Sequence, residues 1–306
     1  MRLRNTMFLV RLARPGHWIK NVAVLLPVVF GRQAGSASAW LSAVVAAAAF
    51  CLASSCAYIV NDIADRETDQ AHPRKKHRPI AAGRVSLRAA CIEAAVLGVG
   101  ALIVAWYISA ALVGLVAVFL LLEIGYSLLL KHKVLVDVIS IALAFVLRAA
   151  AGAVTIAVVI SPWLFVCMFT ACLFMGFCKR YGEVATLGQT AEAGRHRKVL
   201  FAYTPEVLTH LVTVSAGIAV VSFLLYGMSP RTVGEFGTYY FVYTLPVVIY
   251  GVFRFAMLSM KGIYADPTDL ILHDRPFQLA VVVWLAASVG IVYYGKSLSA
   301  WLSGSG

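Results

Sequence analysis

The chain has 306 residues, of which 61% are hydrophobic and only 13% are charged. Soluble domains carry about 25% charged residues, so this composition excludes an ordinary water-soluble domain. The formal net charge of +12 would suit nucleic acid, but the basic residues lie between long apolar segments. Cytoplasmic loops of membrane proteins show that pattern, and we therefore expect membrane lipids, and no nucleic acid, as partners.

The N-terminal stretch, MRLRNTMFLVRLARPGHWIKN at 1–21, is basic and amphipathic. Four arginines, the last of them Arg14, interrupt its apolar residues. A cleaved secretory signal has an unbroken apolar core, so we expect none here. The stretch is instead expected to lie on the membrane surface, with Trp18 at the interface.

Nine apolar segments follow, and most are long enough to cross a bilayer as helices. Their apolar runs are continuous and do not alternate with a period of two, which excludes a membrane β-barrel. We therefore predict an all-α polytopic membrane protein in which residues 1–306 form a single catalytic domain. The predicted spans are about 19–34, 38–60, 88–107, 110–130, 134–157, 161–178, 207–228, 238–260 and 276–295.

The distribution of basic residues predicts the orientation. The N-terminal stretch and every second connection hold 21 of the 26 lysines and arginines; these connections are 61–88, 131–133, 179–198 and 261–275. The excess of positive charge marks the cytoplasmic side. A bacterial inner or plasma membrane protein with a cytoplasmic N-terminus, a cytoplasmic active site and an external C-terminus is expected.

The most polar stretch of the chain, residues 61–83, follows the second apolar segment and reads NDIADRETDQAHPRKKHRPIAAG. Residues four apart share a helix face, so Asn61, Asp65 and Asp69 are expected to line up, and Asp62 would lie on their flank. Carboxylate and amide oxygens suit Mg²⁺, which also binds water and substrate phosphates, and the basic residues beyond suit the phosphates. The alternative is an acidic helix turn followed by a basic loop beside the membrane.

Two ionisable residues fall inside the fifth apolar segment. Asp137 lies near its cytoplasmic end, and Arg148 lies about three helical turns further along, too far for a direct pair. Such residues face a cavity or a partner, so Arg148 is expected to hold an anionic substrate group. The alternative is a structural arginine paired with Glu123 or another buried acid. Tyr126 and Lys131, at the end of the fourth segment, are expected to point into the same cavity.

The connection after the sixth segment, residues 179–206, is basic and contains no aspartate. Lys179, Arg180 and Glu183 extend the preceding helix and are candidates for the site. The basic cluster at 195–198 fits a solvated loop as well as it fits a substrate site.

The last connection, DPTDLILHDRP, contributes Asp266, Asp269, Asp274 and Arg275. The spacing of Asp266 and Asp269 suits a second cation or a helix cap before Leu270, and the sequence does not choose between them.

Five motifs carry a resemblance to a known family. They are RPGHWIKN at 14–21, the stretch at 61–83, LRAAAG at 147–152, KRYGE at 179–183 and LHDRPFQ at 272–278. Together with nine spans they resemble the UbiA-type prenyltransferase superfamily, and within it the decaprenyl-phosphate phosphoribosyltransferase branch. The motifs run from near the N-terminus to the last span, so the resemblance covers nearly the whole chain. It implies a UbiA-like helical bundle with a polar cavity facing the cytoplasm.

One departure from the pattern of the aromatic prenyltransferases indicates the branch of the superfamily. Aromatic prenyltransferases of the superfamily bind a prenyl diphosphate between two aspartate-rich motifs, the second of which lies between spans six and seven. Here that connection carries KRYGE and no aspartate. The resemblance therefore implies Mg²⁺-dependent transfer of 5-phosphoribose from phosphoribosyl diphosphate (PRPP) to a polyprenyl phosphate, with release of diphosphate.

The resemblance and the charges imply roles for individual residues. The expected Mg²⁺ ligands are Asn61, Asp62, Asp65 and Asp69. Asp65, Asp69 and Glu183 are the expected catalytic residues. Candidates for binding the substrates are Lys20, Asn21, Arg74, Arg78, Tyr126, Lys131, Arg148, Lys179, Arg180, Tyr181 and Arg275.

Two alternatives remain open from the sequence. The first is an aromatic prenyltransferase that uses Mg²⁺ and a prenyl diphosphate. The second is a transporter, which is disfavoured because its charges would lie along a path across the membrane rather than on one side. The chain length of the acceptor and the oligomeric state, a homo-oligomer included, are also left open.

Overall fold

The computed structural model describes residues 8–71, 75–187, 202–264 and 267–302. Every regular element within those ranges is a helix. The chain divides into two compact units, Met1–Val159 and Ile160–Gly306, which are considered one at a time. Three predicted features lie outside the described residues, namely Arg74, Asp266 and the basic cluster at 195–198.

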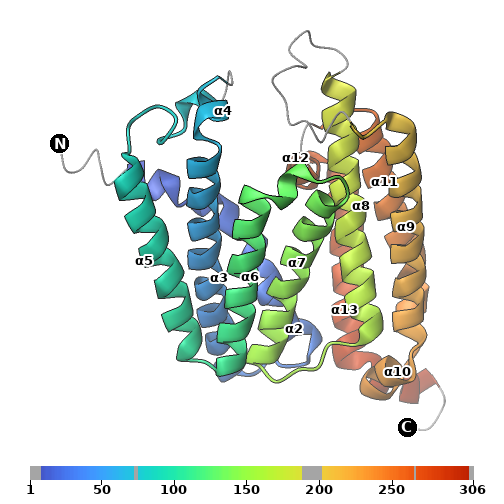
Figure 1. The fold of residues 1–306 in the computed structure, drawn as a ribbon. Coiled ribbons are helices and arrows are strands. Elements are labelled where there is room, and N and C mark those ends of the chain that lie inside the picture. The colour runs from blue at the N-terminus through green and yellow to red at the C-terminus, as the bar shows by residue number, and fades with distance from the viewer. Residues whose placement is uncertain (1–7, 72–74, 188–201, 265–266, 303–306) are drawn as a thin grey trace. The chain divides into compact units, whose positions relative to one another are not determined.

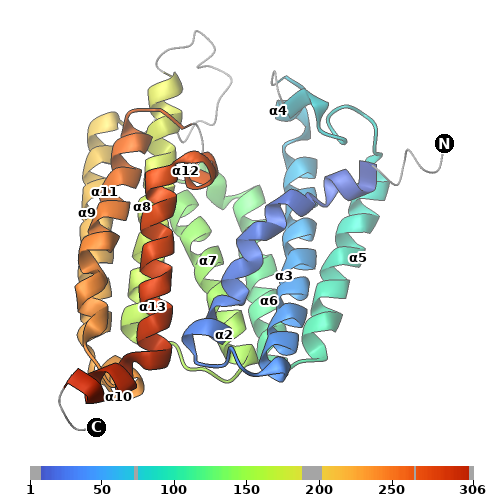
Figure 2. The ribbon, with the colours of Figure 1, turned by 180° about the vertical axis from the view of Figure 1, so that it is seen from behind.

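The first unit is built around one long helix, α3, which packs against η1, α5, α6 and α7 (Figures 1 and 2). Alanines on α3, among them Ala46, Ala49 and Ala53, are fully buried, and such small side chains let helices approach closely within a membrane. The elements, with η for a 3-10 helix, are η1 (Pro15–Val24), α2 (Leu26–Phe30), α3 (Ala37–Ala64), α4 (Arg66–Gln70), η2 (Lys75–His77), α5 (Leu87–Trp106), α6 (Ala110–Leu128), η3 (Leu130–His132) and α7 (Val136–Thr155).

The first predicted span, residues 19–34, is not a continuous α-helix. It consists of the end of η1, the short helix α2 and the turn after it. Pro27 lacks a backbone N–H and cannot sit in a helix interior without the loss of a hydrogen bond, which explains the interruption. The segment nevertheless runs along unit 1 from beside the middle of α3, where Asn21 contacts Cys51 and Ser54, toward the end where α3 begins (Figure 2).

In its described residues, the second unit contains four long helical segments. Its elements are α8 (Pro162–Leu187), α9 (Pro205–Met228), α10 (Pro230–Phe236), η6 (Tyr240–Thr244), α11 (Leu245–Met260), α12 (Pro267–His273) and α13 (Arg275–Leu302). The short helices α10 and α12 lie at opposite ends of this unit (Figure 1). Helix α8 continues to Leu187, so KRYGE at 179–183 is helical, as expected from its position after the sixth span.

Eight helices in the described ranges are long and apolar enough to cross a membrane. Their positions confirm the second to ninth predicted spans to within a few residues, except that α3, α8 and α13 extend further. Side-chain hydroxyls fix several of the starts. Ser36, Ser86 and Ser109 accept hydrogen bonds from the backbone of α3, α5 and α6, and Thr204 does so for α9. The protein is an integral membrane protein of the all-helical class.

Candidate active site

The aspartate-rich motif begins in the last turn of α3 and continues into α4. Helix α3 ends at Ala64 and α4 begins at Arg66, but the backbone keeps a helical register through Asp65. The amide of Asp65 donates to Asn61 O over 2.9 Å, and the amide of Asp69 donates to Asp65 O over 2.8 Å. Four polar side chains are thereby presented from one end of unit 1, where α4 lies (Figure 1).

Asn61 and Asp65 share one cation, the ammonium group of Lys131. Lys131 Nζ lies 2.5 Å from Asp65 Oδ1 and 3.3 Å from Asn61 Oδ1. Lys131 comes from η3, the 3-10 turn after α6, and its side chain is 2% exposed, whereas that of Asp65 is 19% exposed. The lysine therefore lies beneath the carboxylate. The structure brings these three predicted residues together.

Asp62 and Asp69 share a different cation, the guanidinium group of Arg78. Arg78 Nη1 lies 3.0 Å from Asp62 Oδ1 and 2.6 Å from Asp69 Oδ2. These two aspartates are seven residues apart, about two helical turns, so they share a helix face. The expected row of Asn61, Asp65 and Asp69 is thus divided, because Asp69 is grouped with Asp62 and not with Asp65.

Arg14 is a member of this cluster that the sequence analysis did not assign to the site. Its Nη2 donates to Asp62 Oδ1, the same oxygen that Arg78 contacts. Its guanidinium also lies over the ring of Tyr58, 5.4 Å from the centroid. The basic, amphipathic pattern of the N-terminal stretch predicts a membrane-surface position for Arg14, although Arg14 is the first residue of the RPGHWIKN motif. The motif is the feature of the sequence that could have indicated a role for Arg14 in the site.

Arg148 lies in α7 and is buried within a network of its own. Its Nε donates to Asn21 Oδ1 over 2.8 Å, its Nη1 donates to Ala144 O over 2.9 Å, and its Nη2 lies 3.9 Å from Glu123 Oε1. The guanidinium also lies 4.7 Å from the ring centroid of Phe119. The alternative of a structural arginine paired with Glu123 therefore has direct support. The predicted role in holding a substrate anion stays a prediction.

The other predicted residues of unit 1 lie close to these groups in the chain. Asn21 is buried and accepts from Ser54 Oγ over 3.4 Å as well as from Arg148. Lys20 and Tyr126 are half-buried, and Asp137 is fully buried in the first turn of α7. Binding roles for Lys20 and Tyr126 stay predictions.

The predicted residues of unit 2 form separate features. Arg180 is buried in α8 and pairs with Glu183 one turn later. Lys179 and Tyr181 are half-buried beside them, and Arg275 is exposed at the start of α13. The catalytic role of Glu183 stays a prediction. So do the substrate-binding roles of Lys179, Arg180, Tyr181 and Arg275.

Asp274 forms a cap and an ion pair that link two helices of unit 2. Its carboxylate accepts from Arg254 Nε over 2.6 Å, from Arg254 Nη2 over 2.8 Å and from the Phe277 amide over 2.8 Å. The hydrogen bonds from Arg254 lower the pKa of Asp274, and the amide of Phe277 adds to that effect. Asp274 therefore acts as a helix cap. Asp269 lies exposed in the first turn of α12.

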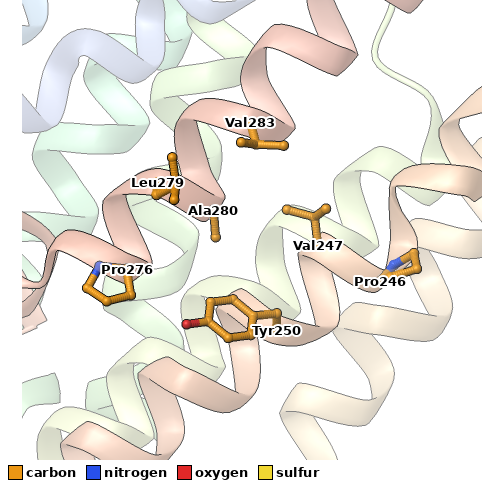
Figure 3. A pocket seen from close by; sticks show the side chains of 7 residues that line it. All are labelled: Pro246, Val247, Tyr250, Pro276, Leu279, Ala280 and Val283. Atoms are coloured by element: carbon orange, nitrogen blue, oxygen red, sulfur yellow. The ribbon is translucent and has the colours of Figure 1, made fainter.

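Unit 2 also has an apolar groove of about 370 Å³ between α11 and α13 (Figure 3). It is lined by Pro246, Val247, Tyr250, Pro276, Leu279, Ala280 and Val283. None of these side chains is charged. The lining of the groove therefore offers no cationic side chain to pair with a phosphate.

Within the described ranges, no three His, Cys, Asp or Glu side chains are gathered as a metal site would require. The chemistry of the motif still fits Mg²⁺, because its donors are carboxylate and amide oxygens. Asp65 is the most accessible carboxylate of the motif's two ion-pair groups. These carboxylates contact the cationic side chains of Arg14, Arg78 and Lys131. The cluster therefore combines oxygen ligands that suit a metal ion with N–H groups that suit an anion.

Residues 23–265 match the model of the UbiA prenyltransferase family. The chain belongs to the UbiA prenyltransferase family. The match includes the aspartate-rich motif, Arg78, Lys131, Arg148 and the KRYGE motif, but it begins after Arg14.

Two curated relatives have the same printed description, decaprenyl-phosphate phosphoribosyltransferase. The one from Mycolicibacterium smegmatis is 33% identical over 94% of this chain and 92% of its own length. The one from Corynebacterium glutamicum is 31% identical over 93% of this chain and 86% of its own length. These similarities extend over nearly all of both proteins in each pair.

Solved structures show the same fold. A UbiA homolog from Archaeoglobus fulgidus, bound to GPP and Mg²⁺, superposes with a TM-score of 0.69 over 93% of this chain and 99% of the other. The two sequences are 18% identical, so this likeness concerns the fold alone. The predicted UbiA-like helical bundle is confirmed.

Proposed function

We propose that this protein transfers 5-phosphoribose from PRPP to a polyprenyl phosphate and releases diphosphate. The observation that carries the proposal is the similarity, at 33% identity over 94% of the chain, to a decaprenyl-phosphate phosphoribosyltransferase. The residues of unit 1 are consistent with it, because a compact set of carboxylates and cations suits a substrate that arrives as a metal diphosphate.

The transfer breaks the bond between C1 of the ribose and the diphosphate oxygen, and it forms a bond between C1 and an oxygen of the lipid phosphate. The electron pair of the broken bond leaves with the diphosphate. The lipid phosphate is already ionised at neutral pH, so this attack needs no strong general base. The isoprenoid tail is expected to lie between helices that open to the bilayer.

Each chemical part has candidate residues. Asn61, Asp62, Asp65 and Asp69 are the proposed Mg²⁺ ligands, and the ion, when bound, neutralises the charge on the departing diphosphate. Arg78 lies beside these oxygens and is proposed to bind phosphate oxygens, while Lys131 lies beneath Asp65 and adds positive charge there. Their positive charges also lower the local repulsion between the carboxylates and an incoming anion.

The site is proposed to face the cytoplasm. The N-terminal stretch and the connections that follow α3 and α6 carry most of the lysines and arginines of unit 1. Short basic connections mark the cytoplasmic side of membrane proteins. PRPP and Mg²⁺ would then reach the site from the cytoplasm, while the lipid reaches it from the membrane.

The decisive experiment compares two substrate mixtures with purified protein. One contains PRPP and polyprenyl phosphate, and the other contains a prenyl diphosphate with hydroxybenzoate or a quinone precursor. We expect Mg²⁺-dependent release of diphosphate, together with a phosphoribosylated lipid, only in the first mixture. Product in the second mixture alone would establish an aromatic prenyltransferase and overturn the proposal.

A further inference from the structure

The end of unit 1 opposite the aspartate-rich motif holds a polar pocket. It has a volume of about 270 Å³ and lies where α3 begins and α7 ends (Figure 2). The polar residues that line it are Gln33, Ser36, Ser38, Ser42 and Thr155. None of the lining side chains is charged or aromatic. The pocket therefore offers hydrogen bonds to a neutral group and no charge to pair with an ion.

Backbone hydrogen bonds fix the turn that forms one wall of the pocket. The amide of Gln33 donates to Val28 O over 2.9 Å, as in a Schellman motif at the end of a helix. Arg32 has φ 59°, the left-handed position that glycine usually takes in this motif. Trp40 Nε1 on α3 donates to Ala34 O over 2.9 Å and attaches the turn to that helix. The backbone that carries Gln33 is thus held in place by the protein itself.

Two polar side chains of the pocket make no hydrogen bond within the described residues, namely the amide of Gln33 and the hydroxyl of Ser42. Hydroxyls of other spans are satisfied by their own helix. Ser127 and Ser140, for example, donate to the carbonyl oxygen four residues earlier over 2.9 Å and 2.7 Å. Polar groups without a partner are costly where water is scarce. Gln33 and Ser42 are therefore available to a ligand.

Exposed apolar side chains lie next to the pocket residues in the chain. Leu41 is 67% exposed and follows Ser38 by three residues, so it lies on the same side of α3, one turn deeper in the span. Val154, directly before Thr155, is 41% exposed. Exposed apolar side chains of a membrane span contact lipid tails. The surroundings of the pocket therefore suit a molecule with a polar head and an apolar tail.

We propose that this pocket binds the hydroxyl-bearing headgroup of a membrane lipid in the leaflet at this end of unit 1. The headgroup hydroxyls bond to Gln33 and Ser42, and the tails lie along Leu41. Arg32 is exposed in the same turn, and its positive charge suits the phosphate of an anionic lipid such as phosphatidylglycerol. The inference is independent of the proposed function, because the aspartate-rich motif lies at the other end of unit 1 (Figure 2).

The size and lining of the pocket favour this class of headgroup. Pockets that enclose a drug-sized ligand measure roughly 300–1,000 Å³, so about 270 Å³ suits a headgroup of a few heavy atoms. A quaternary ammonium headgroup is typically recognised by aromatic side chains, which the lining lacks. Hydroxyl groups both donate and accept, and the amide of Gln33 and the hydroxyl of Ser42 do the same.

The test is a lipid titration of the full-length protein in detergent micelles, followed by the unfolding temperature. The lipids are phosphatidylglycerol and phosphatidylpropanol, which has the same charge, tails and headgroup carbons but lacks both hydroxyls. In wild type, half-maximal stabilisation should need about tenfold to a hundredfold less phosphatidylglycerol than phosphatidylpropanol, as two added hydrogen bonds imply. Ser42→Ala and Gln33→Ala should each raise the phosphatidylglycerol concentration about threefold to tenfold. Neither should change the phosphatidylpropanol concentration.

Thr213→Ala is the matched control. Thr213 is an exposed hydroxyl residue of α9, and it already donates to Thr209 O over 2.9 Å. Its replacement should leave both lipid concentrations unchanged. Because Ser42 makes no hydrogen bond within the described residues, Ser42→Ala should unfold at the wild-type temperature when no lipid is added. That result separates a ligand-binding role of Ser42 from a structural one.

Two results would overturn the proposal. The first is an equal effect of the two lipids on wild type, including no effect of either. The second is a phosphatidylglycerol titration that is the same in wild type, Ser42→Ala and Gln33→Ala, since the pocket would then hold water only. Free glycerol at the same concentrations should not stabilise the protein. Stabilisation by glycerol that is lost in Ser42→Ala would reveal a site for a free polyol and would overturn the assignment to a lipid.

Discussion

Lys131 is buried beneath Asp65, and its ammonium group occupies the side of the carboxylate that faces the protein. The two residues are 66 positions apart in the chain, and they meet because η3 returns the end of α6 to the end of α3. An ammonium group at this place lowers the affinity of the same carboxylate for any further cation. Lys131 is therefore expected to weaken the proposed binding of Mg²⁺ at Asp65.

Replacing this lysine is expected to strengthen metal binding. In Lys131→Met a cation that competes for Asp65 is removed, while the apolar stem of the side chain remains. We expect the Mg²⁺ concentration for half-maximal thermal stabilisation to fall by about tenfold, which corresponds to 1.4 kcal/mol. Turnover with PRPP should decrease at the same time, because the buried cation that fixes the positions of the Asp65 and Asn61 side chains is lost.

Lys133→Met is the control for this change. Lys133 is exposed and lies two residues further along the chain. Its replacement removes the same charge from the same connection without touching Asp65. Weaker Mg²⁺ binding in Lys131→Met than in wild type would show that the lysine supports the metal site and does not compete with it.

Gly152 of α7 provides a test of the packing of the first segment. A Cβ atom at this position would lie 2.0 Å from Val24 O and 2.8 Å from Val24 C, which are backbone atoms that cannot rotate away. We therefore expect Gly152→Ala to separate η1 from α7 and to destabilise the protein by about 1–3 kcal/mol, as overpacking does. The measurement is the unfolding temperature in detergent or nanodiscs.

Gly114→Ala serves as the comparison, since a Cβ atom there would meet nothing within 4 Å. Gly114 lies inside α6, where alanine is the better helix former by about 1 kcal/mol, so this variant should be as stable as wild type or more so. Equal stability of both variants would mean that η1 and α7 do not approach as closely as the structure indicates.

The spans could be predicted because they depend on local properties of the chain. Long apolar runs and the hydroxyl residues before them determine where α3, α5, α6 and α9 begin. The place of the aspartate-rich motif followed directly, since it continues the end of α3. The structure of the first apolar segment is less predictable from the sequence. Its length favours a continuous helix, whereas Pro27 interrupts one.

The partners of the charged residues could not be predicted in the same way. Arg14 and Asp62 are 48 residues apart, and a composition rule places Arg14 on the membrane surface. Only the packing of η1 against α3 brings the two together. Likewise, helical periodicity groups Asp69 with Asp65, whereas Arg78, held after α4, groups Asp69 with Asp62. Such choices depend on tertiary contacts, which periodicity does not contain.

A substitution at Arg148 tests whether this residue has a structural role or binds substrate. Its guanidinium donates to Asn21 and to Ala144 O, and it lies near Glu123. Arg148→Lys keeps the charge but cannot make the same planar set of hydrogen bonds. We expect a loss of about 1.5–3 kcal/mol in stability, because a buried charged hydrogen bond disappears. Thermal unfolding without substrate measures this loss.

A double-mutant cycle identifies the partner. Asn21→Ala should also lower the stability, because it removes one partner of Arg148. Arg148→Lys should therefore destabilise the Asn21→Ala variant less than it destabilises the wild type. If both variants keep wild-type stability and only PRPP or lipid binding weakens, Arg148 is a substrate-binding residue, as the sequence suggested.

Asp274 predicts a pH dependence for the stability of unit 2. The hydrogen bonds from Arg254 hold the pKa of Asp274 below its ordinary value of about 3.9. The folded-state pKa is therefore lower than the unfolded one, so the ionised carboxylate stabilises the fold at pH values above about 4. That contribution is lost as the pH falls through the folded-state pKa. Asp274→Asn should lower the unfolding temperature at pH 7, although asparagine can still cap α13.

The difference in unfolding temperature between wild type and Asp274→Asn should then narrow as the pH falls below about 4, since protonation neutralises the wild-type side chain as well. Asp269→Asn is the matched control, because Asp269 is an exposed aspartate on the neighbouring helix α12. It should leave the unfolding temperature unchanged at either pH. A constant difference for Asp274→Asn from pH 7 to pH 3 would mean that the carboxylate charge adds nothing to the hydrogen bonds, and that Arg254 pairs with Asp274 without stabilising the connection between α11 and α13.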